Sequence, residues 1–187
     1  MSTRATPYTA APETITPTAA NLIGATRIAL GFVFAWAFLD KLFGLGYSTP
    51  SAKAWINGGS PTTGFLGAVK TGPFREMFNG WSGQAWVDWL FMLGLAGLGV
   101  ALLVGAGLRV AAVAGTLMMA LMWLADWPPA KTTATGEPTG STNPVIDYHV
   151  IYALLMIIFA AVSAGRYWGL GNRWTSFGFV QRNRWLI

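Results

Sequence analysis

The stretch DWLFMLGLAGLGVALLVGAGLRVAAVAGTLMMALMW, residues 88–123, decides the fold of this chain. It is apolar almost throughout, and the short turn GAGLR divides it into two segments. A helix needs about 20 apolar residues to cross a hydrocarbon core of ~30 Å, so we expect spans at about 86–107 and 109–127. The sequence therefore predicts two membrane-spanning helices joined by a tight hairpin.

Two further apolar segments extend this interpretation, at about 22–43 and 144–166. The composition agrees with a membrane protein, because 53% of the 187 residues are hydrophobic and only 10% are charged. Small residues recur at close spacing, as in Gly31 with Ala35, which lets helices approach one another in lipid. We predict an all-α fold, a polytopic membrane four-helix bundle.

The remaining segments predict the domain organisation. Residues 1–20, rich in Thr, Ala and Pro, should form a flexible tail, and 21–167 the transmembrane domain. Residues 44–85 are dense in Gly, Pro and aromatics and should fold as an extracytoplasmic cap loop. Residues 168–187 combine arginines with Trp and Phe, which is typical of a segment in the membrane interface.

Charge and composition exclude several classes of function. The side of the membrane that holds both termini carries most of the arginines, so both termini should be cytoplasmic. The basic residues are scattered, which favours a lipid bilayer over nucleic acid as the partner. The chain has no cysteine and one histidine, so thiolate chemistry and bis-histidine haem ligation are excluded, and we predict no metal site.

Six ionisable side chains lie at the predicted outer ends of the four spans, and every span contributes at least one. We call this set the ionisable girdle. Charges inside a membrane are costly unless paired, so they mark either a functional path or a paired structural network. We predict catalytic roles for three girdle residues and ligand-binding roles for the other three and a nearby tyrosine. Ordinary boundary residues that lock the helices together are the alternative. The catalytic set is Lys41, Asp147 and His149; the ligand-binding set is Asp40, Asp88, Asp126 and Tyr152.

The first span brings one charge into the membrane. Only 12 residues separate Arg27 from Asp40, a rise of ~18 Å at 1.5 Å per residue, which is less than the hydrocarbon thickness. We expect Asp40 and Lys41 to lie below the outer interface. Arg27, Arg109 and Arg166 mark the inner ends and are predicted structural or interface residues.

The start of the fourth span predicts how the girdle is arranged. Asn143 can cap this helix, and Pro144 suits its first turn. In a helix His149 lies about 200° around the axis from Asp147, so the two should not face the same partner. We expect Asp147 to pair with Lys41, and His149 to meet a ligand, the cap loop or a neighbouring protein.

Four motifs, taken in order, carry a resemblance to a known family. They are RIALGFVFAWAFLDKLFGLGYSTP, WINGGSPTTGFL, the 88–123 stretch and NPVIDYHVIYALLMIIFAAVSAGRYWGLGNRW. Together they resemble the DoxX/DoxD-like membrane proteins of actinobacteria, over about residues 22–174. The resemblance implies a four-helix protein of the bacterial cytoplasmic membrane, linked to thiosulfate:quinone oxidoreductase or to oxidative-stress complexes. Its charged motif positions correspond to Lys41, Asp147 and His149, with Arg27 and Arg109 at the inner ends.

Two functions follow as hypotheses. In the first, the chain is the membrane subunit of a quinone-linked oxidoreductase, and the girdle exchanges protons with the quinone. Without cysteine, a nucleotide motif or a metal set, any enzymatic activity would need a partner that brings the electron donor. In the second, the chain is a noncatalytic accessory subunit, held by a protein partner or as a homo-oligomer in a larger membrane complex.

Overall fold

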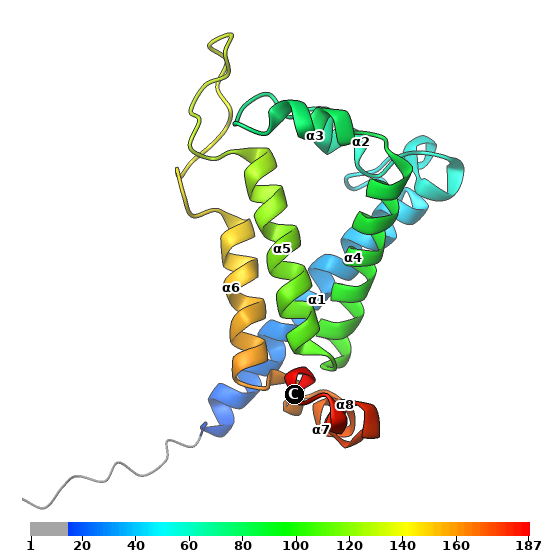
Figure 1. Cartoon of the computed structure of the whole chain (residues 1–187), viewed down its shortest axis with the longest axis vertical. Helices are drawn as coiled ribbons and strands as arrows, with labels where there is room; N and C mark the ends of the chain where they lie inside the picture. The colour runs from blue at the N-terminus through cyan, green and yellow to red at the C-terminus, as the bar shows by residue number, and fades with distance from the viewer. Residues whose placement is uncertain (1–14) are drawn as a thin grey trace, which may run out of the picture.

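The computed structural model describes residues 15–187, and this part of the chain is helical with no β-strand (Figure 1). Short helices join four longer ones. The longer ones are α1 (Pro17–Phe43), α4 (Ala85–Val104), α5 (Leu108–Asp126) and α6 (Tyr148–Ala161).

Three of these helices, α1, α4 and α5, are long and apolar enough to cross a membrane. Helix α6 is apolar too, but its 14 residues span only ~21 Å. The prediction of one continuous helix over 144–166 is therefore wrong, because α6 begins later and ends earlier than predicted. Extended chain precedes α6, and a left-handed Ser163 separates it from the short 3-10 helix η3 (Ala164–Arg166).

Local signals set the ends of the helices. Helix α1 begins at Pro17, where the Thr16 side chain accepts a hydrogen bond from the Ala19 amide. Helix α1 therefore includes the last residues of the predicted tail, 17–20. Residues 1–14 of that tail lie outside the described part of the chain. Gly105 and Gly107 adopt left-handed backbone angles between α4 and α5, which lets the GAGLR turn reverse the chain within a few residues.

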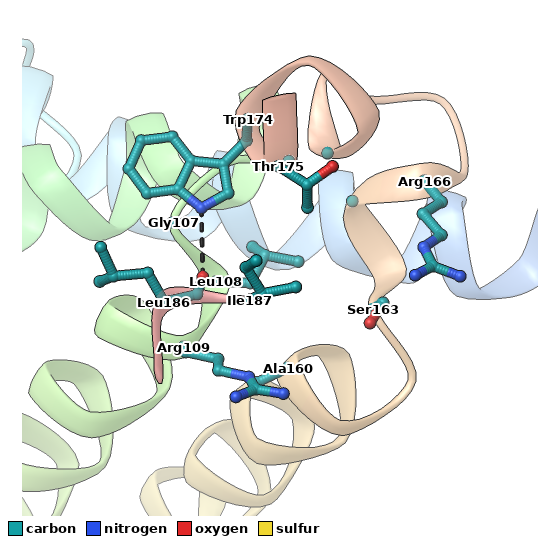
Figure 2. Close-up of a pocket in the computed structure, with 13 residues that line it drawn as sticks. Gly107, Leu108, Arg109, Ala160, Ser163, Arg166, Trp174, Thr175, Leu186 and Ile187 are labelled. Atoms are coloured by element: carbon teal, nitrogen blue, oxygen red, sulfur yellow. Dashed lines mark hydrogen bonds between the residues drawn. The ribbon is translucent and has the colours of Figure 1, made fainter. Parts of the chain in front are cut away.

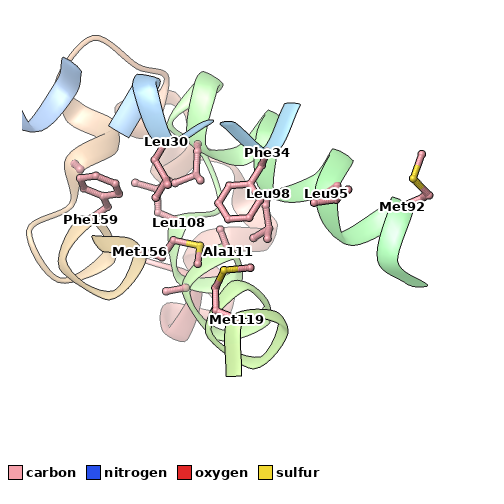
Figure 3. Packing of buried hydrophobic residues seen from close by; sticks show 13 residues of the cluster. Leu30, Phe34, Met92, Leu95, Leu98, Leu108, Ala111, Met119, Met156 and Phe159 are labelled. Atoms are coloured by element: carbon pink, nitrogen blue, oxygen red, sulfur yellow. The ribbon is translucent and has the colours of Figure 1, made fainter. Parts of the chain in front are cut away.

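The four longer helices share one apolar core (Figure 3). Helix α1 packs mainly on α4, and α6 packs mainly on α5. The packing of α1 on α4 depends on small residues. A Cβ atom added at Gly99 of α4 would lie only 2.8 Å from the Ala35 amide nitrogen of α1. Small residues thus bring α1 and α4 into backbone contact, as helices packed in lipid require. The core includes Leu30, Phe34, Met92, Leu95, Leu98, Met119, Met156 and Phe159.

The outer surface of the helices is apolar as well. Large hydrophobic side chains are exposed on all four, such as Phe32, Leu90, Val113 and Leu154. A water-soluble domain rarely exposes so continuous an apolar surface. With the three long apolar helices, this surface indicates a membrane protein in contact with a lipid bilayer.

Short helices cover the two ends of the assembly (Figure 1). Residues 44–85 fold over the end that carries Asp88, here called the acidic end. The C-terminal segment folds at the opposite end, here called the arginine end, where α1 begins. The predicted interfacial tail 168–187 thus contains short helices, and its Leu186 is buried. The acidic-end elements are η1 (Ser51–Lys53), η2 (Trp55–Asn57), α2 (Thr63–Leu66) and α3 (Arg75–Trp81); those at the arginine end are α7 (Gly171–Ser176), α8 (Gly178–Arg182) and η4 (Arg184–Leu186).

Candidate functional site

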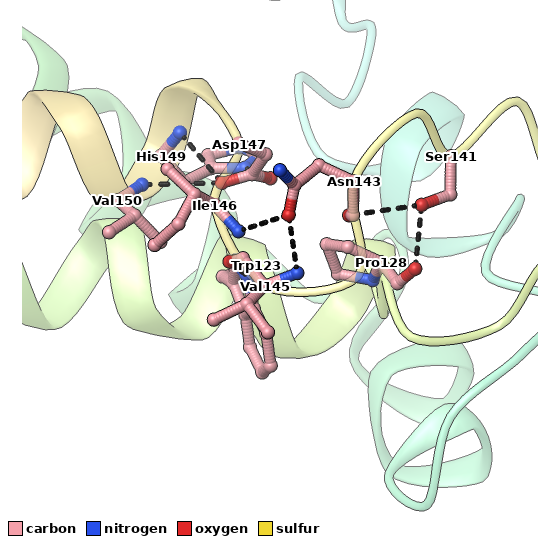
Figure 4. Close-up of polar contacts among 9 residues, drawn as sticks. All are labelled: Trp123, Pro128, Ser141, Asn143, Val145, Ile146, Asp147, His149 and Val150. Carbon is pink, nitrogen blue, oxygen red and sulfur yellow. Dashed lines mark hydrogen bonds and ion pairs between the residues drawn. The ribbon is translucent and has the colours of Figure 1, made fainter.

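Asp147 and His149 form a close pair where α6 begins (Figure 4). Asp147 is the N-cap residue, and its backbone is extended rather than helical. Its carboxylate accepts hydrogen bonds from the amides of His149 and Val150, at 3.0 and 3.2 Å. The other carboxylate oxygen, Oδ2, lies 2.7 Å from Nδ1 of the His149 ring. One carboxylate therefore caps the helix and fixes the imidazole at the same time.

The predicted arrangement of this segment was wrong. Asn143 does not cap the helix; its side-chain oxygen accepts from the Val145 and Ile146 amides, both at 2.9 Å. The helix begins five residues later, so the 200° separation of Asp147 and His149 does not apply to a cap residue outside the helix. Asp147 and His149 face each other.

The imidazole of His149 is fully buried, with 0% of the residue exposed. The Tyr148 ring lies against it, with 4.0 Å between ring centroids. In the neutral ring with the proton on Nδ1, Asp147 accepts from Nδ1–H and the second ring nitrogen, Nε2, holds a lone pair. Nε2 is buried and has no hydrogen-bond partner among the described residues. Buried polar atoms are rarely left unpaired, so this nitrogen is the unusual atom of the acidic end.

Asp126 connects this pair to the surface. It is the last residue of α5 and is exposed, and one ligand atom from each of Asp126, Asp147 and His149 lies within 4.8 Å of the others. Trp123 of α5 donates to the Val145 carbonyl at 2.9 Å and holds the preceding segment in place. Two carboxylates and an imidazole could bind a divalent ion such as Mn²⁺ or Zn²⁺, or pass a proton from the buried ring to the surface.

Asp40 fastens the cap loop to the end of α1. The side chain is buried, and its carboxylate accepts hydrogen bonds from the Tyr47 and Ser48 amides, at 3.2 and 3.0 Å. The Ser48 hydroxyl adds a third at 2.6 Å. These bonds tie the start of the cap loop to the end of α1. The ligand-binding role of Asp40 stays a prediction.

Asp88 ties down the next part of the cap loop in the same way. Its Oδ1 accepts from the hydroxyls of Ser60 and Thr62, at 2.9 and 2.5 Å, and from the Thr62 amide at 3.2 Å. The carboxylate lies in the first turn of α4, where the helix dipole favours a negative charge. The sequence placed Asp88 correctly at a helix end but did not indicate these hydroxyl partners.

The girdle is therefore divided rather than continuous. Only Asp126, Asp147 and His149 come together. Lys41 is partly buried and forms no ion pair within residues 15–187, so the predicted pair of Lys41 with Asp147 was wrong. Asp147 takes its partner from its own segment instead. Tyr152 packs its ring against Phe34 and Tyr148, with centroids 6.1 and 5.8 Å apart.

At the arginine end, Arg27 is buried with 0% of the residue exposed. Its guanidinium donates to the carbonyls of Leu102 and Leu103 in the last turn of α4. It also donates to the carbonyls of Tyr167 and Trp168, at 2.9 and 3.1 Å. One cation thus joins α1, the end of α4 and the C-terminal segment.

Arg109 and Arg166 lie at the same end but differ from Arg27. Both are exposed, and both line a cavity formed with the C-terminal segment. Neither makes a hydrogen bond or an ion pair through its side chain within residues 15–187.

No protein-family model, curated protein or solved structure matches this chain. The resemblance to the DoxX/DoxD-like proteins therefore stays a prediction.

Proposed function

We propose that this chain is a membrane subunit that exchanges protons with a quinone at the Asp147–His149 pair, as part of a quinone-linked oxidoreductase. The observation that carries the proposal is the buried His149 ring, whose Nδ1 is fixed by Asp147 while Nε2 has no partner. An imidazole held by a carboxylate on one nitrogen and free on the other is the arrangement of a general acid or base.

The proton chemistry follows from the two ring nitrogens. A hydroquinone hydroxyl donates a hydrogen bond to the Nε2 lone pair of His149. When the hydroquinone is oxidised, it loses two protons and two electrons: one proton moves to Nε2, the other passes to water, and both electrons pass to a redox centre on a partner protein. Asp147 stabilises the imidazolium that forms, since a carboxylate within hydrogen-bond distance favours the charged ring. The exposed Asp126, at the edge of the same cluster, leads the proton to water.

The membrane topology is part of the proposal. Helices α1, α4 and α5 each cross the bilayer, and α6 crosses it together with the extended residues before it and the turn after it. The described start of α1 and the C-terminal segment lie at the same end (Figure 1), which supports placing both termini on one side. The excess of arginine there supports a cytoplasmic location, and the resemblance to the DoxX/DoxD-like proteins supports a bacterial cytoplasmic membrane.

We place the access route at Tyr148, whose ring lies against the imidazole and which is itself 54% exposed. A quinone that arrives from the lipid would displace this ring to reach Nε2. Rotation of one half-exposed aromatic side chain is a fast and inexpensive motion. The catalytic role of Lys41 stays a prediction, because no described acceptor fixes its ammonium group.

The test measures the affinity of the full chain in lipid nanodiscs for quinone. Quenching of tryptophan fluorescence reports the binding. His149→Phe fills the same space without a ring nitrogen and should weaken binding about tenfold or more, the loss of about 1.4 kcal/mol. Asp147→Asn keeps an N-cap but removes the charge, and should lower the rate of quinol oxidation with the partner present. Glu137→Gln, an acid-to-amide change on an exposed residue outside the site, is the matched control.

Two results would overturn this function. Wild-type protein that binds no quinone would favour the accessory-subunit hypothesis, in which the pair only fixes the start of α6. Equal quinone affinity in wild type and His149→Phe would place the quinone elsewhere. Helical circular dichroism of each variant shows that the fold is retained.

A further inference from the structure

A cavity at the arginine end has a polar rim that the proposed function does not use (Figure 2). Its cationic groups are the guanidiniums of Arg109, in the first turn of α5, and Arg166, in η3. Figure 2 shows the Ser163 hydroxyl between these two guanidiniums. All three side chains line the same cavity. No acidic side chain lines this cavity, whereas Glu76 lines the cavity that contains Lys70 and Arg75.

The polar groups of the rim have no partners within the described residues. Neither guanidinium takes part in an ion pair, and the Ser163 hydroxyl makes no hydrogen bond. Ser163 also has a left-handed backbone, with φ of 50°, which an L side chain rarely adopts. Two free guanidiniums and a free hydroxyl supply the donors that a phosphate group accepts.

Four of the 13 residues that line the cavity are glycines, namely Gly105, Gly107, Gly165 and Gly171. The others contribute side chains, among them the apolar Leu108, Leu186 and Ile187. The far wall is fixed because the Trp174 indole donates to the Leu186 carbonyl at 3.2 Å. A small anionic group can therefore approach the backbone closely inside a wall that is already formed.

The exposed apolar side chains of the C-terminal segment favour a lipid over a free anion. This segment supplies Trp174 and Thr175 to the cavity lining and also exposes five large hydrophobic side chains, as expected of chain that lies in the membrane interface. A phosphate held in the cavity would place attached acyl chains along this apolar surface. The five are Trp168, Leu170, Phe177, Phe179 and Trp185.

We propose that this cavity binds the phosphate of an anionic phospholipid. Arg109 and Arg166 hold its oxygens from two sides, Ser163 donates a third hydrogen bond, and the acyl chains lie against the apolar residues of the C-terminal segment. The lipid would thereby join the start of α5 to the segment that follows α6.

The test measures lipid affinity of the full chain, delipidated in mild detergent, by native mass spectrometry. Phosphatidylglycerol should bind at least about tenfold more tightly than phosphatidylcholine. The double variant Arg109→Gln and Arg166→Gln should lose about tenfold in phosphatidylglycerol affinity. The matched control is Arg173→Gln with Arg184→Gln, which removes the same charge from exposed positions of the C-terminal segment outside the cavity. It should lose less than about threefold.

A second variant separates geometry from charge. Ser163→Gly accepts the left-handed backbone and leaves the net charge unchanged, so a threefold loss of affinity would support a direct hydrogen bond. Equal losses in the two arginine double variants would overturn the proposal, because any surface arginine would then suffice. Inorganic phosphate that displaces the lipid at similar concentration would also overturn it and would identify a free-anion site. Quinone binding at the opposite end should be unaffected by all of these variants.

Discussion

Buried ionisable side chains at the two ends of the helical assembly are stabilised by different partners. At the arginine end, Arg27 is fully buried and donates to four backbone carbonyls. At the acidic end, Asp40 and Asp88 accept three hydrogen bonds each from the cap loop. His149 is as deeply buried but has one partner and one unpaired nitrogen. Arg27 also has one buried nitrogen, Nε, without a partner among the described residues, so neither burial nor an unpaired nitrogen indicates function by itself. The proposed function depends on a further difference: a neutral imidazole nitrogen can accept a proton, whereas a guanidinium nitrogen cannot.

The physical reason for the difference is the supply of free backbone groups. The last carbonyls of a helix have no partner within it, and the end of α4 presents such carbonyls to Arg27. The cap loop presents free amides and hydroxyls to Asp40 and Asp88. His149 is the second residue of α6, where the Asp147 carboxylate accepts from the amides of His149 and Val150 and no free backbone group of the described residues is bonded to Nε2.

Removal of Arg27 should have the largest effect on stability. Arg27→Leu keeps the apolar volume but leaves buried carbonyls of α4 and of the C-terminal segment without donors. We expect a loss of about 3–5 kcal/mol in the free energy of unfolding, the range for breaking a buried charged network. Thermal or denaturant unfolding in detergent, followed by helical circular dichroism, measures it.

The matched control is Arg173→Leu, which removes an exposed arginine at the same end and should change stability by less than about 0.5 kcal/mol. If both variants lost the same stability, Arg27 would act only through net charge, and the contrast between the two ends would disappear.

The sequence predicted the helices better than the site, for a reason visible in α4 and α5. A helix facing lipid must be apolar on its outside as well as its inside, so Leu90 and Val113 mark their spans regardless of tertiary contacts. Helix α6 was misplaced because Asn143–Pro144 and Asp147 both provide plausible starts, and only the Trp123 and His149 contacts decide between them.

The girdle was harder to predict, because partners of buried acids can lie far along the chain. Ser60 and Thr62 reach Asp88 from 28 and 26 residues away, within a loop that has no hydrophobic periodicity. The polar cluster in GGSPTT was a usable signal, since Ser and Thr hydroxyls are donors that a buried carboxylate can accept from. Nothing in the sequence indicated that Asp147 would take its own neighbour rather than Lys41.

Asp88→Ala should have the second-largest effect and should act locally. It leaves the Ser60 and Thr62 hydroxyls and an amide without their acceptor, at a cost of about 1–3 kcal/mol. We expect faster proteolysis in residues 58–64, with the helices intact. Asp88→Asn retains one carbonyl oxygen and should recover most of the protection. Uniform cleavage over the whole chain would show that Asp88 supports the helices rather than the loop.

We expect the smallest effect on stability from substitutions of Asp147. They test whether its two roles, capping α6 and fixing the His149 ring, can be separated. Asp147→Ala removes the N-cap and should cost about 1 kcal/mol, whereas Asp147→Asn caps nearly as well and should cost only a few tenths. In both variants the imidazole loses its charged partner. If stability follows the cap while quinol oxidation falls in both, the carboxylate acts on His149 independently of the helix. If activity instead follows stability, Asp147 belongs with Asp40 and Asp88 as a residue that only fastens a loop to a helix end.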